Sequence, residues 1–191
     1  SMIYSVRQLS RQTLDIMFKM HIRSCIDYCI QVFGNSINET QIAKLDKLQH
    51  RAAKVTTMVM KFTSKEKLFL DLGWENYKTR IEYLSLCLFH KIHTHETRPQ
   101  IRDCMPPTNH NQNATRSQRY YNNYPTRDAE FNNSFFPKTV RNWNNLPVYL
   151  RNLSIYEFKL ELAEIMKPKK NRLHNIGSKF GNSIHTQIRL N

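Results

Sequence analysis

The chain has 191 residues, of which 40% are apolar, so it can fill one buried core and does not have the composition of a disordered tail. Its 29 Lys and Arg against 15 Asp and Glu give a net charge of +14, which points to nucleic acid or to an acidic protein as the partner. Four scattered cysteines exclude a disulfide-framed secreted module, and no apolar run reaches the roughly 20 residues that cross a bilayer. We therefore expect an intracellular protein of the nucleus or cytoplasm, without a membrane partner.

The first predicted element is helical and covers residues 8–33, as one long amphipathic helix or as two. The chain contains only four glycines, and this scarcity favours helices over a sheet with many turns. Apolar side chains recur in this stretch at intervals of three and four residues. The residues expected on its buried side are Leu14, Met17 or Phe18, His21 or Ile22, Cys25, Tyr28 or Cys29, and Val32.

A second helix is predicted from Asn38, which can cap it while Gln41 reaches back to the backbone of Asn38. Its apolar residues are Ile42, Leu45, Leu48, Ala52, Val55 and Val59, and its other face carries Lys44, Lys47, Arg51 and Lys54. This basic stripe is typical either of a solvated face or of a surface that binds anions. Ser64 then caps a short helix that Gly73 ends, and residues 76–93 form another core-facing helix.

Residues 95–133 are predicted to form a long polar loop, because the segment is rich in Thr, Asn, Gln, Arg and Tyr and contains four prolines. Between Cys104 and Arg127 there is no acidic residue. Arginines can fork onto phosphates and tyrosines can stack on bases. The candidate nucleic-acid contacts here are Arg116, Arg119, Tyr120, Tyr121, Tyr124 and Arg127. The alternative is that these Tyr and Arg side chains pin the loop to its own protein.

The stretch after the loop, residues 133–147, is predicted to anchor it. Pro137 can begin a short helix that ends at about Asn144 or Asn145, with Phe136, Val140 and Trp143 on one face. The expected anchor residues are Phe135, Phe136, Trp143, Leu146 and Pro147. Stacking of these rings on a base is the alternative. Lys138 and Arg141 are candidate phosphate contacts in the same helix.

The last predicted helix begins at Ser154, which forms a capping box with Glu157 and turns Phe158 and Leu162 inward. We expect one helical domain over residues 3–166. Residues 167–191 contain six Lys or Arg and no acid, which is typical of a basic tail or linker. Lys169, Lys170 and Arg172 are its candidate nucleic-acid contacts.

One cluster has zinc-ligand chemistry, namely Cys87, His90 and His93 with Cys104 farther on. Its spacing matches no standard zinc finger, so we predict no metal site and no cofactor. Cys25 and Cys29 lie one turn apart without a second pair, and we expect them to be core thiols. No cysteine, histidine and orienting group form a recognisable catalytic pattern, so we also predict no catalytic residue.

Several short motifs together resemble a known family. They are residues 22–29 (IRSCIDYC), 44–53 (KLDKLQHRAA), 72–74 (LGW) with Arg80, 115–116 (TR), 134–147 (SFFPKTVRNWNNLP), 158–159 (FK), 175–177 (NIG) and 184–190 (IHTQIRL). In this order they resemble the thumb and the segment beyond it in reverse transcriptases of jockey-like non-LTR retrotransposons. The resemblance covers nearly the whole chain. It implies a region that helps to hold the RNA template, the primer duplex or the target DNA.

The same resemblance implies that this chain does not polymerise or cut on its own. Polymerase activity in that family needs palm aspartates in a Tyr-x-Asp-Asp turn that binds Mg²⁺, and the chain contains no Asp-Asp pair.

The sequence thus predicts a mostly α-helical domain of four or five main helices with a long pinned loop. Its expected function is non-catalytic binding of RNA, RNA–DNA hybrid or DNA, mainly through phosphates. The alternative is a retrotransposon fragment that acts in a host as a protein-interaction or regulatory domain.

Overall fold

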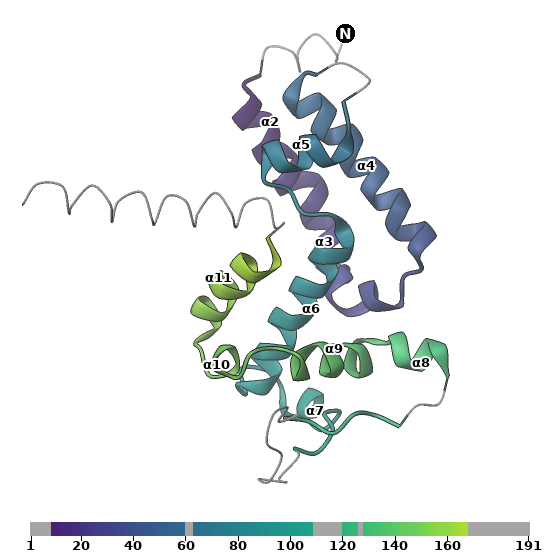
Figure 1. Ribbon diagram of the computed structural model, residues 1–191, viewed down its shortest axis with the longest axis vertical. Helices are drawn as coiled ribbons and strands as arrows, with labels where there is room; N and C mark the ends of the chain where they lie inside the picture. The colour runs from purple at the N-terminus through teal and green to yellow at the C-terminus, as the bar shows by residue number, and fades with distance from the viewer. Residues whose placement is uncertain (1–8, 60–62, 109–119, 126–127, 168–191) are drawn as a thin grey trace, which may run out of the picture.

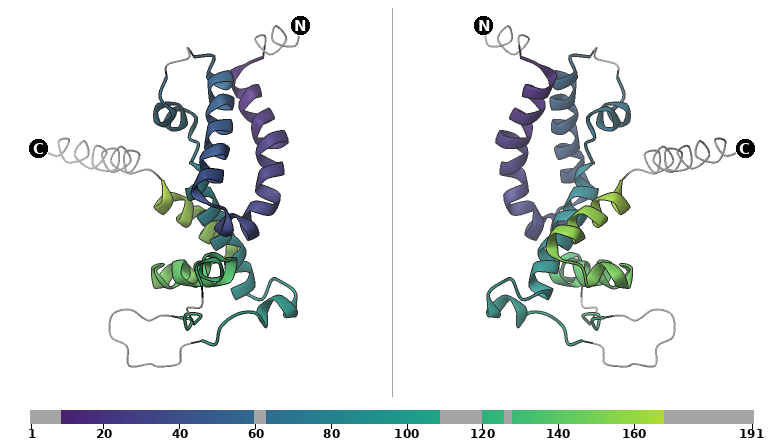
Figure 2. Two further views of the ribbon diagram at one scale, coloured as in Figure 1. Left: turned by 90° about the vertical axis from the view of Figure 1, so that its right-hand side faces the viewer. Right: turned by 90° about the vertical axis from the view of Figure 1, so that its left-hand side faces the viewer.

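The computed structural model describes residues 9–59, 63–108, 120–125 and 128–167, which are mostly helical (Figure 1). These residues contain no strand, only an isolated bridge between Thr108 and Tyr121. The predicted fold class is therefore confirmed. Helix α6 (Tyr77–His93) runs through the middle of the molecule, and the longer helices that pack against it are α3 (Ser24–Phe33), α4 (Glu39–Thr57), α9 (Phe135–Asn144) and α11 (Ile155–Met166) (Figures 1 and 2).

The first long helix contains a π-helical segment. It begins as α2 (Arg11–Met17), continues as η1 (Phe18–Arg23) and ends as α3 (Ser24–Phe33). A π segment closes its hydrogen bonds over five residues instead of four, so the helix after it is rotated relative to an uninterrupted α-helix. For brevity we call the whole element the α2–α3 helix.

This rotation changes which residues the α2–α3 helix buries. Leu14, Phe18 and Ile30 are buried, as a regular helix would allow for the first two. Cys25 and Cys29 are exposed, so the prediction that they are core thiols is wrong. The residues predicted to face the core after Phe18 instead face outward, because the π segment shifts the register by about one residue.

Helix α4 (Glu39–Thr57) lies beside the α2–α3 helix (Figure 2). A short 3-10 turn, η2 (Gly34–Ser36), connects the two. A Cβ on Gly34 would lie 2.8 Å from Ile81 Cγ2, so glycine allows this turn to approach α6 closely. The predicted capping box of Asn38 and Gln41 begins α4.

Helix α5 (Lys65–Leu72) begins at its predicted cap Ser64 and ends at Gly73, whose φ of +65° suits glycine. Trp74 follows and stacks on Phe18, with ring centroids 4.5 Å apart. This contact closes a core cluster that also includes Ala53, Leu68 and Phe69. A second small cluster joins Ile30 of α3 to Tyr77 and Ile81 of α6.

The largest core cluster surrounds the second half of α6 and involves α9 (Phe135–Asn144), α10 (Val148–Arg151) and α11 (Ile155–Met166). Helix α9 begins two residues before the predicted start, which places Pro137 in the first turn, where its missing N–H costs no helical hydrogen bond. The capping box of Ser154 and Glu157 opens α11 as predicted. Two short helices, α7 (Pro99–Arg102) and α8 (Ala129–Asn133), interrupt the stretch predicted as one loop.

Candidate nucleic-acid interface

The arginine-bearing loop is held at its described ends. Thr108 and Tyr121 form an antiparallel bridge, and Asn122 N donates to Pro107 O at 3.2 Å. The Asn144 side chain on α9 accepts from Tyr121 N at 3.1 Å and donates to Tyr121 O at 2.9 Å. The chain therefore leaves at residue 108 and returns at residue 120 beside α9. Candidates Arg116, Arg119 and Arg127 lie outside the described residues.

The three tyrosines of the loop do not share one role. Tyr121 is only 6% exposed, and its hydroxyl lies 2.8 Å from His93 Nδ1. Tyr124 is half-buried and donates its hydroxyl hydrogen to the Cys104 carbonyl. Burial raises the pKa of both phenols, that of Tyr124 to about 12. Tyr121 thus pins the loop instead of stacking on a base, which corrects the prediction, while Tyr120 remains 39% exposed.

Helix α9 presents Lys138 and Arg141 three residues apart, both half-buried. Burial lowers the pKa of Lys138, and the charges of Lys78 and Arg141 act in the same direction. Arg141 Nη2 donates to the Asn132 carbonyl at 2.5 Å, which ties α8 to α9. Lys138 is therefore the cation on α9 that can contact a phosphate. Arg141 uses at least one of its N–H donors in a hydrogen bond within the fold.

The predicted basic stripe lies on the outer side of α4. Lys44, Lys47 and Arg51 are exposed and make no ion pair with another described residue, whereas Lys54 is half-buried. Three unpaired cations in two turns form an electropositive strip that a nucleic-acid backbone can approach.

Most of the net charge lies outside the described residues. Ten of the 29 Lys and Arg and none of the 15 Asp and Glu fall there, Lys169, Lys170 and Arg172 of the predicted tail among them. The described residues therefore carry 19 cations against 15 acids. The helical body is close to electrical balance, and the excess positive charge belongs to the segments between and after its helices.

Trp143 occupies the centre of the largest core cluster. Its side chain is fully buried, with ring centroids 5.1 Å from Phe89, 5.2 Å from His93 and 5.7 Å from Phe158. A ring in this position packs the core and cannot also stack on a base. Among the other predicted anchor residues, Phe135 is buried, Phe136 and Leu146 pack against the cluster while half-buried, and Pro147 is exposed.

The residues with zinc-ligand chemistry make other contacts in the fold. His90 Nε2 lies 3.0 Å from the Leu153 carbonyl oxygen, and His93 Nδ1 contacts Tyr121. Burial raises the pKa of the Cys87 thiol to about 11, which opposes the thiolate that zinc binds. Cys104 is exposed. Among the described parts of the chain, no three His, Cys, Asp or Glu side chains are grouped so as to hold a metal.

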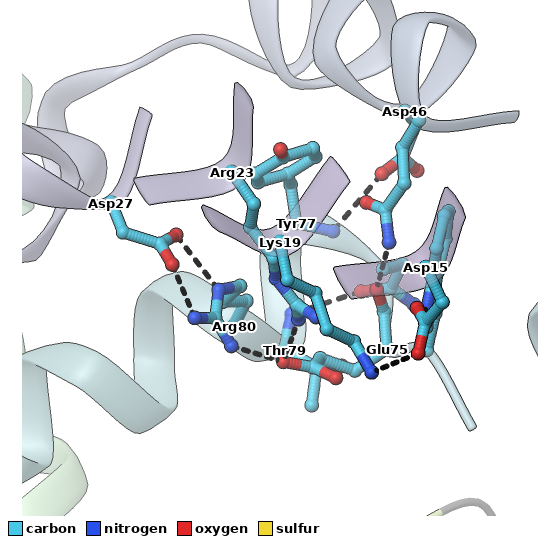
Figure 3. Close-up of polar contacts among 12 residues, drawn as sticks. Asp15, Lys19, Arg23, Asp27, Asp46, Glu75, Tyr77, Thr79 and Arg80 are labelled. Carbon is cyan, nitrogen blue, oxygen red and sulfur yellow. Dashed lines mark hydrogen bonds and ion pairs between the residues drawn. The ribbon is translucent and has the colours of Figure 1, made fainter. Parts of the chain in front are cut away.

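An ionic network that the sequence analysis missed joins the α2–α3 helix to the start of α6 (Figure 3). Arg80 Nε donates to Asp27 Oδ1 at 2.7 Å, and a second nitrogen of Arg80 binds the other Asp27 oxygen. Arg80 Nη1 also lies 2.5 Å from Glu75 Oε1. Arg23, whose side chain is nearly buried, donates to the same Glu75 oxygen. Two guanidinium groups and two carboxylates thus balance each other's charge.

The network shifts the pKa values of Glu75 and Arg80. Burial alone would raise the pKa of Glu75, but the charges of Arg23 and Arg80 outweigh it and hold that pKa below its ordinary value. Burial likewise opposes the charge on Arg80, yet hydrogen bonds to Asp27 and the charge of Glu75 raise its pKa. Glu75 and Arg80 are therefore charged at neutral pH.

Further polar contacts extend the network along the α2–α3 helix. Trp74 Nε1 donates to Asp15 Oδ1 at 2.9 Å, and Lys19 Nζ lies 2.7 Å from Asp15 Oδ2 (Figure 3). Asp15, Lys19, Arg23 and Asp27 follow one another at intervals of four residues, and this charged spacing was the sequence signal for the network. The apolar pattern of the same residues gives no indication of the ionic network.

A pocket of about 340 Å³ lies where the turn from α5 to α6 faces the end of α11, lined by Trp74, Arg80, Tyr83 and Met166 among others. Its charged groups already have partners, since Arg80 belongs to the network and Lys167 pairs with Glu164. The pocket therefore offers no free charge to a ligand.

No helix among the described residues has the length and hydropathy needed to cross a bilayer. No protein-family model, curated protein or solved structure matches the chain.

Proposed function

We propose that this protein is a non-catalytic nucleic-acid-binding module that holds RNA, RNA–DNA hybrid or DNA mainly through its phosphates. The observation that carries the proposal is the separation of charge. The helical body is nearly balanced, while ten cations and no acid lie in the remaining segments. These ten positive charges are not balanced by any acidic residue in the same segments. An excess of positive charge of this kind attracts a polyanion.

The position of the arginine-bearing loop supports the same proposal. Its described ends are fixed to α9 by the Thr108 to Tyr121 bridge and by Asn144. Closing a loop on a rigid helix reduces the conformational entropy that binding would otherwise cost. Tyr120 is an accessible aromatic side chain at this attachment, and Lys138 is a half-buried cation farther along α9; they add a stacking surface and a phosphate contact.

We further propose that the chain corresponds to the thumb and following region of a non-LTR retrotransposon reverse transcriptase. Residues from three of the motifs that carry the resemblance meet in one place. Arg23 and Asp27 from the first motif and Arg80 from the third share the ionic network, Trp74 from the third donates to Asp15, and Gln49 from the second donates to the Glu75 backbone carbonyl. The motifs thus support one packing arrangement of α2–α3, α4 and α6.

The test is fluorescence anisotropy with labelled single-stranded RNA, duplex DNA and RNA–DNA hybrid at low and high salt. We expect log K to fall by about 0.7 to 0.9 per decade of salt for each phosphate neutralised. Replacing Arg116 and Arg119 with Gln should weaken binding about ten-fold and reduce that slope. The matched control removes two exposed cations that pair with acids, Arg11→Gln with Lys78→Gln, and should change affinity about two-fold or less.

Salt-independent binding, or equal losses in the arginine and control variants, would contradict phosphate binding by the loop. Absence of binding to all three probes at low salt would contradict the proposal as a whole.

A second candidate function is that of a protein-interaction or regulatory domain, in which the same cations dock an acidic protein. One observation favours it, namely the exposed apolar side of the α2–α3 helix, which includes Met20 and Tyr28. A folded protein that retains no nucleic acid but binds an acidic peptide in a salt-dependent manner would support this candidate against the first.

A further inference from the structure

We propose that two copies of this chain associate through the outer face of the α2–α3 helix. This outer face consists of exposed residues, namely Met17, Met20, His21, Ser24, Cys25, Tyr28, Cys29 and Val32. Their steps of three and four residues place them on one side of the helix. The opposite side carries Leu14, Phe18 and Ile30 of the core together with the ionic network.

The outer face is mostly apolar, with His21 and Ser24 as its polar side chains. Tyr28 is 81% exposed, and Met20, in the π segment, is 64% exposed. Between Met20 and Asn38 the charged residues are Arg23 and Asp27, and both turn inward to the network. A nucleic-acid backbone would find no lysine or arginine on this face to contact. The occupant of this face must therefore bury apolar surface without offering or requiring charge.

A second copy of the chain meets this requirement. Two molecules with a net charge of +14 repel each other wherever their basic segments meet, so close approach is favoured at an uncharged face. Met17, Met20, Tyr28 and Val32 are 45%, 64%, 81% and 40% exposed, so covering them in both copies would bury on the order of 1,000 Å², the lower end of what a specific interface needs.

The arrangement of the face predicts the geometry of the pair. A two-fold axis brings each surface against its own copy, and helices related by an axis perpendicular to them run antiparallel. Cys25 lies near the middle of the outer face, which extends from Met17 to Val32. In the pair, Cys25 therefore lies opposite Cys25 of the other copy, and Met20 of one chain lies near Tyr28 or Cys29 of the other.

The first test measures the mass of the full chain by sedimentation equilibrium, in reducing buffer at high salt after removal of nucleic acid. We expect a dimer at micromolar concentrations. Tyr28→Lys and Met20→Lys each place two like charges in the symmetric interface and should raise the dimer dissociation constant at least about 100-fold. Tyr156→Lys on α11, at another highly exposed tyrosine, is the control and should leave the dimer intact. Far-UV circular dichroism should remain unchanged in all variants, because the three side chains are exposed.

A wild-type monomer at these concentrations, or a Tyr28→Lys variant that still dimerises, would overturn the proposal. Because the measurement excludes nucleic acid, its result does not depend on the function proposed above.

The second test uses the exposed thiols. Cys29→Ser with Cys104→Ser leaves Cys25 as the exposed thiol, while Cys87 is buried. Mild oxidation by copper phenanthroline and oxygen should join two such chains through Cys25, with both thiols losing a proton and an electron to the oxidant. The control, Cys25→Ser with Cys29→Ser, keeps exposed Cys104 and should form at least about ten-fold less covalent dimer. Equal cross-linking of the two variants would contradict the predicted pairing.

Discussion

Replacing Trp143 with alanine measures how much one ring contributes to the fold. The side chain is fully buried, and its Nε1 has no hydrogen-bond partner among the described residues, so the expected loss comes from packing alone. A tryptophan buries up to about 250 Å², which at about 25 cal/mol per Å² sets an upper limit near 6 kcal/mol. Measured Trp→Ala costs in cores are about 3–5 kcal/mol, and we expect Trp143→Ala to lie in that range.

The assay for Trp143→Ala is urea and thermal unfolding followed by far-UV circular dichroism, since the substitution removes one of the two tryptophans that fluorescence would report. A domain of this size should lose roughly 6–20 °C in melting temperature. Tyr149→Ala, which removes an exposed ring from α10, should change stability by about 0.5 kcal/mol or less. A cost below about 1 kcal/mol for Trp143→Ala would refute the burial on which the reasoning depends.

Two further predictions concern charged groups. Asp27→Asn removes one of the two carboxylate charges from the ionic network. Arg80 then loses its bidentate partner while remaining mostly buried. The free energy of unfolding measured in urea should therefore fall by about 2–3 kcal/mol. Glu39→Gln, which breaks an exposed pair with Lys78, should cost about 0.5 kcal/mol or less, and equal costs for the two variants would contradict this assignment. Burial, with the nearby charges of His90, His95 and Arg151, lowers the pKa of His93 to about 4. An unfolded histidine binds its proton near pH 6.5, so the His93 contribution to stability is complete above that pH and is lost as the pH falls towards 4. The free energy of unfolding should drop by about 1–2 kcal/mol more in wild type than in His93→Gln between pH 7 and pH 5. Identical pH dependence in the two proteins would show that the pKa of His93 is the same in the folded and unfolded chain.

The sequence predicted well those features that depend on neighbouring residues. The capping box of Asn38 with Gln41 involves side chains and backbone within one helical turn, and the left-handed conformation at Gly73 needs no distant partner. The burial of Trp143 was also expected, since Phe136, Val140 and Trp143 share one face of a short helix.

Features that depend on distant contacts could not be predicted. Nothing near Tyr121 in the sequence indicates that His93 and Asn144 will hold it, so its apparent suitability for base stacking was misleading. Likewise, Glu75 has two arginine partners, and the more distant of these lies 52 residues earlier in the chain. The apolar pattern of residues 8–33 was real, but the π segment turned much of it towards the solvent.

The π segment accommodates one extra residue in the α2–α3 helix, because its hydrogen bonds span five residues instead of four. Removing one residue within Phe18–Arg23 would therefore allow a continuous α-helix in which α3 keeps its orientation relative to α2 and Asp27 still faces Arg80. Restoring α-helical bonding without a deletion would instead turn α3 by about 100° relative to α2, and Asp27 would move away from Arg80. The π segment thus allows the burial of Leu14 and Phe18 and the salt bridge of Asp27 to form in one helix.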